Sequence, residues 1–506
     1  MDVKASETVT VHYRGETLKA ERGALLSEVV HGEKPCGGRG KCGKCKMTVT
    51  GELSPVTDAE RALLSDAELL RGVRLSCLTR VMGDCRAFSH EDEEDAKILT
   101  AAKGARYALA PTFRRYGVAI DIGTTTVACR LYDTSGVCLA SDAVLNPQSA
   151  WGADVISRIE ASMRGEREAL ATAIRAALNR MLLALAERAG VDAHAIDRVV
   201  ITGNTVMLSL LTREDVTPFS HAPFLPHRLF GETLSAEDLS LDALRGETPI
   251  DLPPCISAFV GADVLCAALA TDMTGGEGKA LLLDIGTNGE MALLRGGRLT
   301  VCSTAAGPAF EGVGISMGMR GGEGAIDRVE IVNGALKPHV IGEKAARGIC
   351  GSGLVDAVAC LLDVEELEDT GYLSTDPVYL TPTVTLALRD IREVQMAKSA
   401  ICAGVETLLL RCGVTAEELS AVYIAGGFGT YLDMHNAARI GLLPRTVARA
   451  ATAVGNAALE GASMLLLDAS AKVRAFDAAR TAVTLPLATD AYFSERYMMG
   501  MLFDGE

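Results

Sequence analysis

Several features that mark other classes of protein are scarce in this sequence. No uninterrupted apolar run approaches the roughly 18 residues of a membrane-spanning helix, and Met1 to Glu7 lack the apolar core of a secretion signal. The net charge of -16 argues against nucleic-acid binding, because phosphate contacts need clustered Lys and Arg side chains. We therefore expect a cytoplasmic protein that binds neither membranes nor nucleic acids.

The composition that remains is that of a globular protein with several domains. The chain has 506 residues, of which 48% are hydrophobic and 23% charged, and the usual domain size of roughly 150 residues suggests about three units. Aromatic residues make up only 4%, whereas glycine occurs 51 times, which favours α/β architecture with Gly-rich ligand loops. The 14 cysteines, in a chain without a secretion signal, predict reduced thiols or metal ligands rather than disulfides.

The chain divides into three stretches by pattern. Residues 1–88 contain strand-like segments at 9–13 and 47–50 and a short helical segment at 24–31. Residues 89–116 carry an acidic run and little core-forming pattern, so we predict a linker there. From residue 117 onward strands and helices alternate, with helices expected at 354–362, at 397–411 and at 167–189, where Gly190 is a typical C-cap.

A cysteine-rich loop predicts a metal centre in the first stretch. Cys36, Cys42 and Cys45 are separated by five and then two residues, and Cys77 follows after 31 more. Four thiolates can hold a 2Fe-2S cluster, and interspersed glycines let the backbone wrap closely around it. A four-cysteine zinc site is the alternative, although its ligands usually come as two short pairs. Cys85 is an alternative fourth ligand, but we prefer Cys77.

This first unit resembles the β-grasp ferredoxins, and in particular those adrenodoxin-like members that have the longer first cysteine gap. The resemblance covers about 85 residues. It implies an α+β fold for residues 1–88 and a 2Fe-2S cluster on Cys36, Cys42, Cys45 and Cys77.

A repeated turn predicts a nucleotide site in the second part of the chain. Asp-Ile-Gly-Thr at 121–124 recurs at 284–287, and each copy follows an apolar strand, so each should form the turn of a β-hairpin. Glycine leaves backbone N–H groups free to converge on phosphate, and threonine hydroxyls add donors. Asp121 and Asp284 make sense as holders of hydrated Mg, because a carboxylate beside a triphosphate requires an intervening cation. A third glycine-rich segment, Gly426 to Gly429, follows an apolar strand and could approach an adenosine closely.

These three elements, in this order, resemble the ATPase superfamily of acetate and sugar kinases, heat-shock chaperones and actin. The resemblance implies an α/β, two-lobed, actin-like ATPase with duplicated ribonuclease-H-like folds over residues 117–506, with lobes of roughly 117–280 and 281–506. The segments beginning at Gly203 and Gly455 would be the connecting helices at the hinge. Asp121 and Asp284 would be catalytic, and the ATP-binding residues would be Gly123, Thr124, Thr125, Thr126, Gly286, Thr287, Asn288, Gly289, Gly426, Gly427 and Phe428.

The whole arrangement resembles the reductive activators of corrinoid proteins. Further motifs carry this resemblance, at 146–148, 152–155, 306–312 and 348–353. It implies ATP-dependent transfer of an electron, through the 2Fe-2S cluster, to a corrinoid protein whose cobalt has fallen to Co(II), restoring Co(I) for methyl transfer. The electron donor would be a reduced ferredoxin or flavodoxin, and a homodimer is one expected assembly. The short linker leaves no room for the extra middle domain of longer family members, which puts dimerisation through such a domain in doubt.

Three other functions remain open from the sequence. A kinase with a fused redox sensor would use the same loops but needs a small-molecule pocket. An activator of a 2-hydroxyacyl-CoA dehydratase would hold its cluster within the ATPase, where Cys302 and Cys350 are the candidates, although core burial is the expected role of both. A ferredoxin that only carries electrons would not hydrolyse nucleotide.

Overall fold

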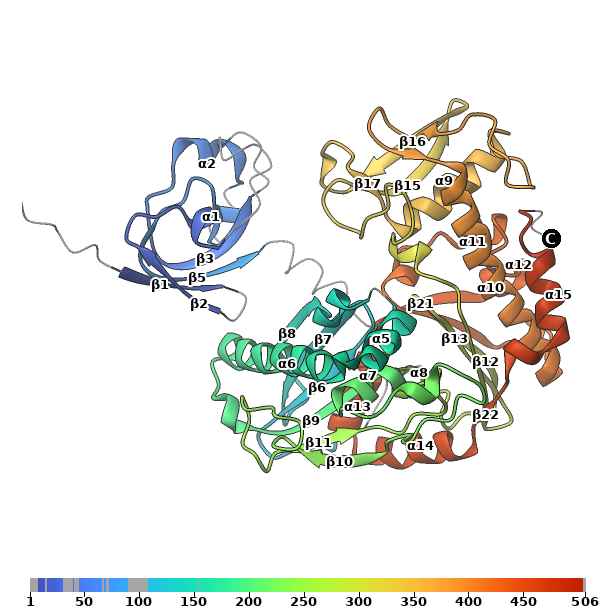
Figure 1. The fold of residues 1–506 in the computed structure, drawn as a ribbon, viewed down its shortest axis with the longest axis horizontal. Helices are drawn as coiled ribbons and strands as arrows, with labels where there is room; N and C mark the ends of the chain where they lie inside the picture. Colours follow the sequence, from blue (N-terminus) through green and yellow to red (C-terminus); the bar gives the residue numbers. More distant parts are fainter. Residues whose placement is uncertain are drawn as a thin grey trace, which may run out of the picture. The chain divides into compact units, whose positions relative to one another are not determined.

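The chain divides into two compact units (Figure 1), the first formed mainly by residues 1–97 and the second mainly by residues 98–506. The computed structural model describes residues 8–13, 16–30, 40, 45–65, 68–69, 72–89, 108–152 and 154–503. Most of the predicted linker, and the predicted ligands Cys36 and Cys42, lie outside the described residues.

The first unit is built on a five-stranded mixed sheet with the order β2-β1-β5-β3-β4. β1 pairs parallel with β5, and the other pairings are antiparallel. The elements are β1 (Thr8–Tyr13), β2 (Glu16–Glu21), α1 (Leu26–Val29), β3 (Lys46–Leu53), α2 (Asp58–Leu63), β4 (Val73–Leu75) and β5 (Val81–Ser89). Its buried side chains form two separate clusters, a larger one over the sheet and a smaller one that contains Cys45 and Cys77.

The second unit contains two six-stranded sheets with the same internal plan. The first has the order β10-β11-β9-β6-β7-β8, and the second β21-β20-β12-β13-β14-β22. In each, three consecutive strands form an antiparallel meander, and two later strands are added in parallel beside its first strand. The strands of the first sheet are β6 (Tyr116–Ile122), β7 (Thr126–Asp133), β8 (Cys138–Leu145), β9 (Ile196–Gly203), β10 (Glu232–Ser235) and β11 (Pro249–Leu252). Those of the second are β12 (Lys279–Ile285), β13 (Gly289–Arg295), β14 (Arg298–Thr304), β20 (Ala421–Ala425), β21 (Ala451–Gly455) and β22 (Val483–Thr484).

This repeated plan places Asp121 and Asp284 at the same position of the two sheets. Each lies one residue before the end of its meander's first strand, followed by the hairpin turn. The predicted hairpins are therefore confirmed.

Helices and small sheets complete the second unit. The longer helices are α5 (Val155–Ala161), α6 (Arg167–Ala189), α7 (Thr205–Leu211), α8 (Ala262–Ala270), α9 (Gly351–Asp363), α10 (Leu388–Cys412), α13 (Ala457–Leu467), α14 (Ala469–Thr481) and α15 (Ala491–Met499), with the short α11 (Met434–Arg439) and α12 (Arg445–Ala450). The small sheets consist of β15 (Ala325–Val332), β16 (Ala335–Val340) and β17 (Gly348–Ile349), and of β18 (Val378–Tyr379) and β19 (Thr385–Leu386). The helix predicted at 167–189 is confirmed to the residue, and Gly190 has the left-handed φ of 68° that a C-cap requires.

α13, the helix that begins after Gly455, packs against α8. α13 also lies on β6 and β9 of the first sheet (Figure 1), so one helix from the C-terminal part of the chain belongs to the first lobe. Gly461 allows this close crossing, because a Cβ atom there would lie 1.9 Å from the carbonyl oxygen of Cys266 in α8.

Two further observations correct the sequence analysis. The helical stretch Val155–Ala189 is long and apolar enough, by length and composition, to cross a membrane, although 56% of its most apolar window is buried within the protein, as in a core helix. The end of the predicted linker is fixed to the second unit, because the backbone N–H groups of Ala110 and Thr112 donate to carbonyls of Leu467 and Leu466.

Candidate functional site

The two predicted phosphate loops form tight turns at the ends of their hairpins. The N–H of Gly123 donates to the carbonyl of Thr126 over 2.9 Å, and that of Gly286 to the carbonyl of Asn288 over 3.0 Å. A Cβ on residue 123 would lie 2.7 Å from the Thr126 carbonyl oxygen, so the first turn requires glycine.

Side chains from three other segments of the chain donate hydrogen bonds to the first phosphate loop. Asn146 donates to the Gly123 carbonyl over 2.8 Å, and the fully buried Arg158 of α5 donates to the Thr124 carbonyl over 2.5 Å. Asn204, the N-cap of α7, donates to the Thr124 hydroxyl over 3.2 Å. Asn146 is marked in the sequence only as part of the 146–148 motif, and the geometry gives it a role in supporting this loop.

Asp121 and Asp284 lie together in a half-buried acidic site. Burial raises the pKa of Asp121 to about 7, with a further contribution from the charge of Asp284, although Asn456 donates a hydrogen bond of 3.0 Å that acts in the opposite direction. Burial and the charge of Glu311 raise the pKa of Asp284 to about 6. Asn456 is the N-cap of α13, so this helix carries a side chain directly to the site.

Two more carboxyl groups belong to this site, those of Asp263 and Glu290, and Asp263 was not predicted as a site residue. Asp263, in the first turn of α8, has its pKa raised by burial and by the charges of Asp284 and Asp121. Burial and the charges of Asp263 and Asp284 likewise raise the pKa of Glu290 on β13. Asp263 belongs to no repeated motif, and only the position of α8 beside both sheets reveals it.

The carboxylates are near one another but do not form a direct metal cage. Among the described residues, no group of three or more His, Cys, Asp or Glu side chains is placed to hold a metal ion by itself.

The third glycine-rich segment adjoins the second phosphate loop. Gly426 has a φ of +90°, and a Cβ there would lie 3.0 Å from the Asp284 carboxylate. Gly427 leads into the turn 428–430, and the Phe428 ring stacks on Phe310 with centroids 5.0 Å apart. The structure therefore brings all three predicted nucleotide-binding segments together.

One carboxylate connects the two phosphate loops. A single oxygen of Glu311, Oε2, accepts hydrogen bonds from the hydroxyls of Thr125 over 2.8 Å and Thr287 over 3.1 Å. These threonines belong to different sheets, so the two turns face each other. In the sequence, Glu311 is marked only by its place in the 306–312 motif.

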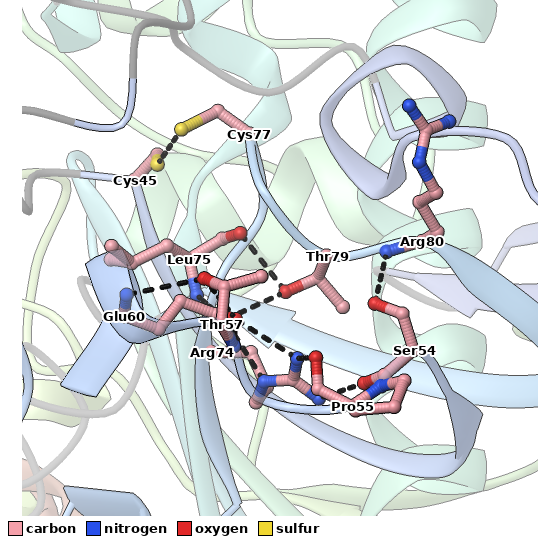
Figure 2. Close-up of polar contacts among 10 residues, drawn as sticks. All are labelled: Cys45, Ser54, Pro55, Thr57, Glu60, Arg74, Leu75, Cys77, Thr79 and Arg80. Carbon is pink, nitrogen blue, oxygen red and sulfur yellow. Dashed lines mark hydrogen bonds and ion pairs between the residues drawn. The ribbon is translucent and has the colours of Figure 1, made fainter.

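In the first unit, two of the predicted metal ligands lie together. The Sγ atoms of Cys45 and Cys77 are 3.1 Å apart and both side chains are buried (Figure 2). Cys85 lies in the other buried cluster, over the sheet, where burial, aided by the charge of Asp84, raises the pKa of its thiol to about 11. The geometry thus groups Cys77, and not Cys85, with Cys45.

A buried ion pair fixes the turn that carries Cys77. Glu60, fully buried on α2, accepts from Arg74 Nε over 2.9 Å, from the Leu75 N–H and from the Thr79 hydroxyl (Figure 2). Burial acts to raise the pKa of Glu60, but these donors and the N–H of Thr57 outweigh it and lower the pKa to about 2. Because Leu75 and Thr79 flank Cys77, the pair determines where its thiol lies.

Comparisons with known proteins find relatives of most of the chain. The family profile described as the RACo middle region matches residues 116–275, and that of the C-terminal, ASKHA domain of RACo matches residues 278–506. The corrinoid activation enzyme RamQ of Eubacterium limosum is 34% identical over 419 residues, which are 77% of this chain and 70% of that protein. The [Co(II) methylated amine-specific corrinoid protein] reductase of Methanosarcina barkeri is 28% identical over 76% of each chain. A solved structure of a reductive activator for corrinoid, iron-sulfur protein has a TM-score of 0.72, 26% identity and 98% coverage of both chains.

The two profile matches divide the second unit between residues 275 and 278. The RACo middle region corresponds to residues 116–275, the stretch that contains the whole first sheet. They also establish an actin-like ATPase fold for the C-terminal part of the chain.

Proposed function

Because this chain belongs to the RACo family of corrinoid activators, we propose that it reductively activates a corrinoid protein in a reaction driven by ATP hydrolysis. One electron passes from a reduced ferredoxin or flavodoxin, through the first unit, to Co(II), which becomes Co(I). The relatives RamQ and the methylated-amine corrinoid protein reductase bear names that state corrinoid targets, which supports this assignment.

The residues of the first unit fit a 2Fe-2S cluster. Cys45 and Cys77 are buried and already close together, as two thiolate ligands of one centre must be, and Cys36 and Cys42 stay the predicted remaining ligands. Gly40, with a φ of +64°, would place a Cβ 2.7 Å from the Leu78 side chain, so residue 40 itself lies close to the Cys77 turn. A plant-type cluster would supply a one-electron carrier with a potential near about -400 mV.

The main support for the proposal comes from the nucleotide site. Thr125 and Thr287, which lie in the hairpin turns of the two six-stranded sheets, both donate to Oε2 of Glu311. Two turns that face each other in this way can clamp the phosphates of one ATP, with Gly426, Gly427 and Phe428 towards the adenosine. Asp121, Asp284 and Asp263 would hold hydrated Mg²⁺ through water molecules.

The other functions have less support. Cys302 and Cys350, which a dehydratase activator would need as cluster ligands, are 0% and 7% exposed and lie in the hydrophobic core or at its edge. A kinase would need a substrate pocket beside the nucleotide, whereas the names of the relatives state corrinoid targets. Metal analysis of the purified protein distinguishes a four-cysteine zinc site from the proposed 2Fe-2S cluster.

Several finer assignments remain predictions. These are the ferredoxin identity of residues 1–88, the linker 89–116, the ribonuclease-H-like identity of each lobe, the cytoplasmic location, the electron donor and a homodimer. Size-exclusion chromatography with light scattering tests the last of these.

The decisive experiment measures cobalt reduction. Chain loaded with cluster, a low-potential reductant, Mg-ATP and a Co(II) corrinoid protein should yield the Co(I) spectrum, and omission of ATP should nearly abolish it. Cys77→Ala should keep nucleotide binding and lose electron transfer, whereas Asp284→Ala should keep a reducible cluster and lose the ATP-driven step. Equal Co(I) yields with and without ATP, across several corrinoid partners, would show that the ATPase serves another purpose.

A further inference from the structure

Glu311 accepts hydrogen bonds from the two threonine hydroxyls that the proposed site would use to bind the phosphates of a nucleotide. A threonine hydroxyl has one O–H and donates one hydrogen bond at a time. The hydroxyls of Thr125 and Thr287 both donate to Glu311 Oε2. Neither can donate to a phosphate oxygen until its bond to Glu311 is broken.

The charge of Glu311 also opposes a nucleotide at this position. Its other oxygen, Oε1, lies 3.2 Å from where a Cβ of Gly286 would be, so the carboxylate fills the space directly against the second phosphate loop. Its charge already contributes to the raised pKa of Asp284. A polyphosphate brought to the same loops would meet this anion at short range, where like charges repel strongly.

The turn that carries Glu311 is coupled to the third nucleotide-binding segment. Glu311 ends the short helical turn Ala309–Glu311, and the preceding Phe310 stacks on Phe428. Gly312, with a φ of +77°, packs so closely on Met319 that a Cβ would lie 2.6 Å from its carbonyl oxygen. The turn therefore contacts all three nucleotide loops, and its displacement would move Phe310 and the segment 312–319 with it.

We propose that Glu311 is a latch that ties the phosphate loops of the two lobes together while the nucleotide site is empty and is displaced when phosphates take over Thr125 and Thr287. The displacement moves the turn 309–312 and so transmits occupancy of the phosphate site to the adjoining segment 312–319. This inference rests on the proposed ATP site and adds to it a residue that opposes binding.

Two simpler roles predict different results. A catalytic base for water would affect the rate of hydrolysis and leave nucleotide affinity unchanged. A brace that only stabilises the fold would lower thermal stability on removal and would not make nucleotide bind more tightly.

The test compares nucleotide affinity by isothermal titration calorimetry. Glu311→Gln keeps the size of the side chain and its oxygen acceptor but removes the charge, so Mg-ADP and a non-hydrolysable Mg-ATP analogue should each bind about tenfold more tightly than to the wild type, about 1.4 kcal/mol. Glu323→Gln is the matched control, since Glu323 pairs with Lys344 and touches neither phosphate loop. Affinity for Glu311→Gln equal to or weaker than that of the wild type overturns the latch.

A measurement on the unmodified chain covers the case in which the variant does not fold. On addition of the non-hydrolysable analogue, amide hydrogen exchange should slow at 123–126 and 286–289 and become faster at 309–312. Slower exchange at 309–312 as well overturns the latch but leaves the ATP site intact. Failure of the wild type to bind either nucleotide overturns the latch and the proposed function together.

Discussion

Single residues of the functional site lower the folding stability of the protein, and Asp121 is the clearest case. Its folded pKa of about 7 lies above the value of about 3.9 for an unfolded chain. The folded state therefore retains a proton that the unfolded state has lost between these values, and stability falls as pH rises through this interval. At pH 8 the ionised carboxylate should destabilise the nucleotide-free protein by about 2 kcal/mol, a value reduced because the side chain is only half-buried.

We accordingly expect Asp121→Asn to abolish ATP hydrolysis while raising the Tm of the nucleotide-free protein by about 2–4 °C at pH 8. At pH 5 about a third of this penalty remains, because the unfolded carboxyl has already lost most of its proton there, so the difference in Tm should be correspondingly smaller. Differential scanning fluorimetry at both pH values checks this. A lower Tm for the variant at pH 8 would show that the aspartate is better solvated or better paired than the raised pKa indicates.

Single substitutions also test which of two buried cysteines, Cys77 or Cys85, is the fourth ligand of the cluster. Cys77→Ala should remove or destabilise the cluster, with loss of about two iron and two sulfide per chain, because its thiol lies 3.1 Å from that of Cys45. Cys85→Ala, the matched control, should keep full iron and sulfide content, since Cys85 packs in the other hydrophobic cluster. Iron and acid-labile sulfide analysis of anaerobically purified protein decides. Stoichiometric zinc without sulfide would favour the zinc site instead.

At the scale of elements, the turn that carries Cys77 depends on α2 through one ion pair. Glu60→Gln leaves the buried Arg74 charge without a counter-ion, and breaking such a pair typically costs about 3–5 kcal/mol. We expect the urea midpoint for loss of the visible cluster spectrum to fall sharply. Glu68→Gln is the control, because its pair with Lys46 is more exposed and does not touch the Cys77 turn, so its midpoint should shift much less. Equal shifts would mean that the pair has no special role in holding the turn.

The close crossing of α8 and α13 can be tested by adding a Cβ at Gly461. Gly461→Ala gains about 1 kcal/mol of helix propensity, but its Cβ would lie 1.9 Å from a backbone carbonyl of α8, and overpacking typically costs about 1–3 kcal/mol. Because the Cβ would meet a backbone atom, which cannot move aside easily, the overpacking should outweigh the gain in helix propensity. We therefore expect a lower Tm. ATP turnover should fall too, because α8 carries Asp263 and α13 presents Asn456 to Asp121. Gly275→Ala, with no atom within 4 Å of its Cβ, should leave both unchanged.

Elements that depend on local chemistry could be predicted from the sequence, and those that depend on distant contacts could not. Gly190 ends α6 by its own left-handed conformation, and the two Asp-Ile-Gly-Thr copies form the hairpins expected of apolar strands around a glycine turn. The partner of α13 could not be predicted, because a helix pairing is set by sheet order, which the sequence does not display locally. Asp263 and Glu311 escaped notice for the same reason, since their neighbours come from strands and loops far away in the chain.

At the scale of the whole molecule, the two chemistries occupy different units of the chain. The predicted cluster ligands lie within residues 36–77, and the acidic nucleotide site is built from residues between Asp121 and Asn456. ATP can influence an electron transfer in the other unit only through conformation or partner binding. Reversing a two-state equilibrium from 1:99 to 99:1 needs a differential affinity of about 5.5 kcal/mol, which sets the scale of what nucleotide binding must provide.

The last prediction follows from this requirement. If nucleotide binding drives one conformational change and hydrolysis resets it, a non-hydrolysable ATP analogue should support at most one Co(I) per chain, whereas ATP should support many. The measurement is the Co(I) absorbance in single-turnover and multiple-turnover mixtures, with ADP as the control that should give neither. Repeated turnover with the analogue would mean that binding alone drives the cycle, and no product with the analogue would place the electron transfer after hydrolysis. In either case Asp284→Ala, which keeps the cluster, should resemble the reaction without nucleotide, because the second phosphate loop and its neighbouring Gly426 segment meet at that carboxylate.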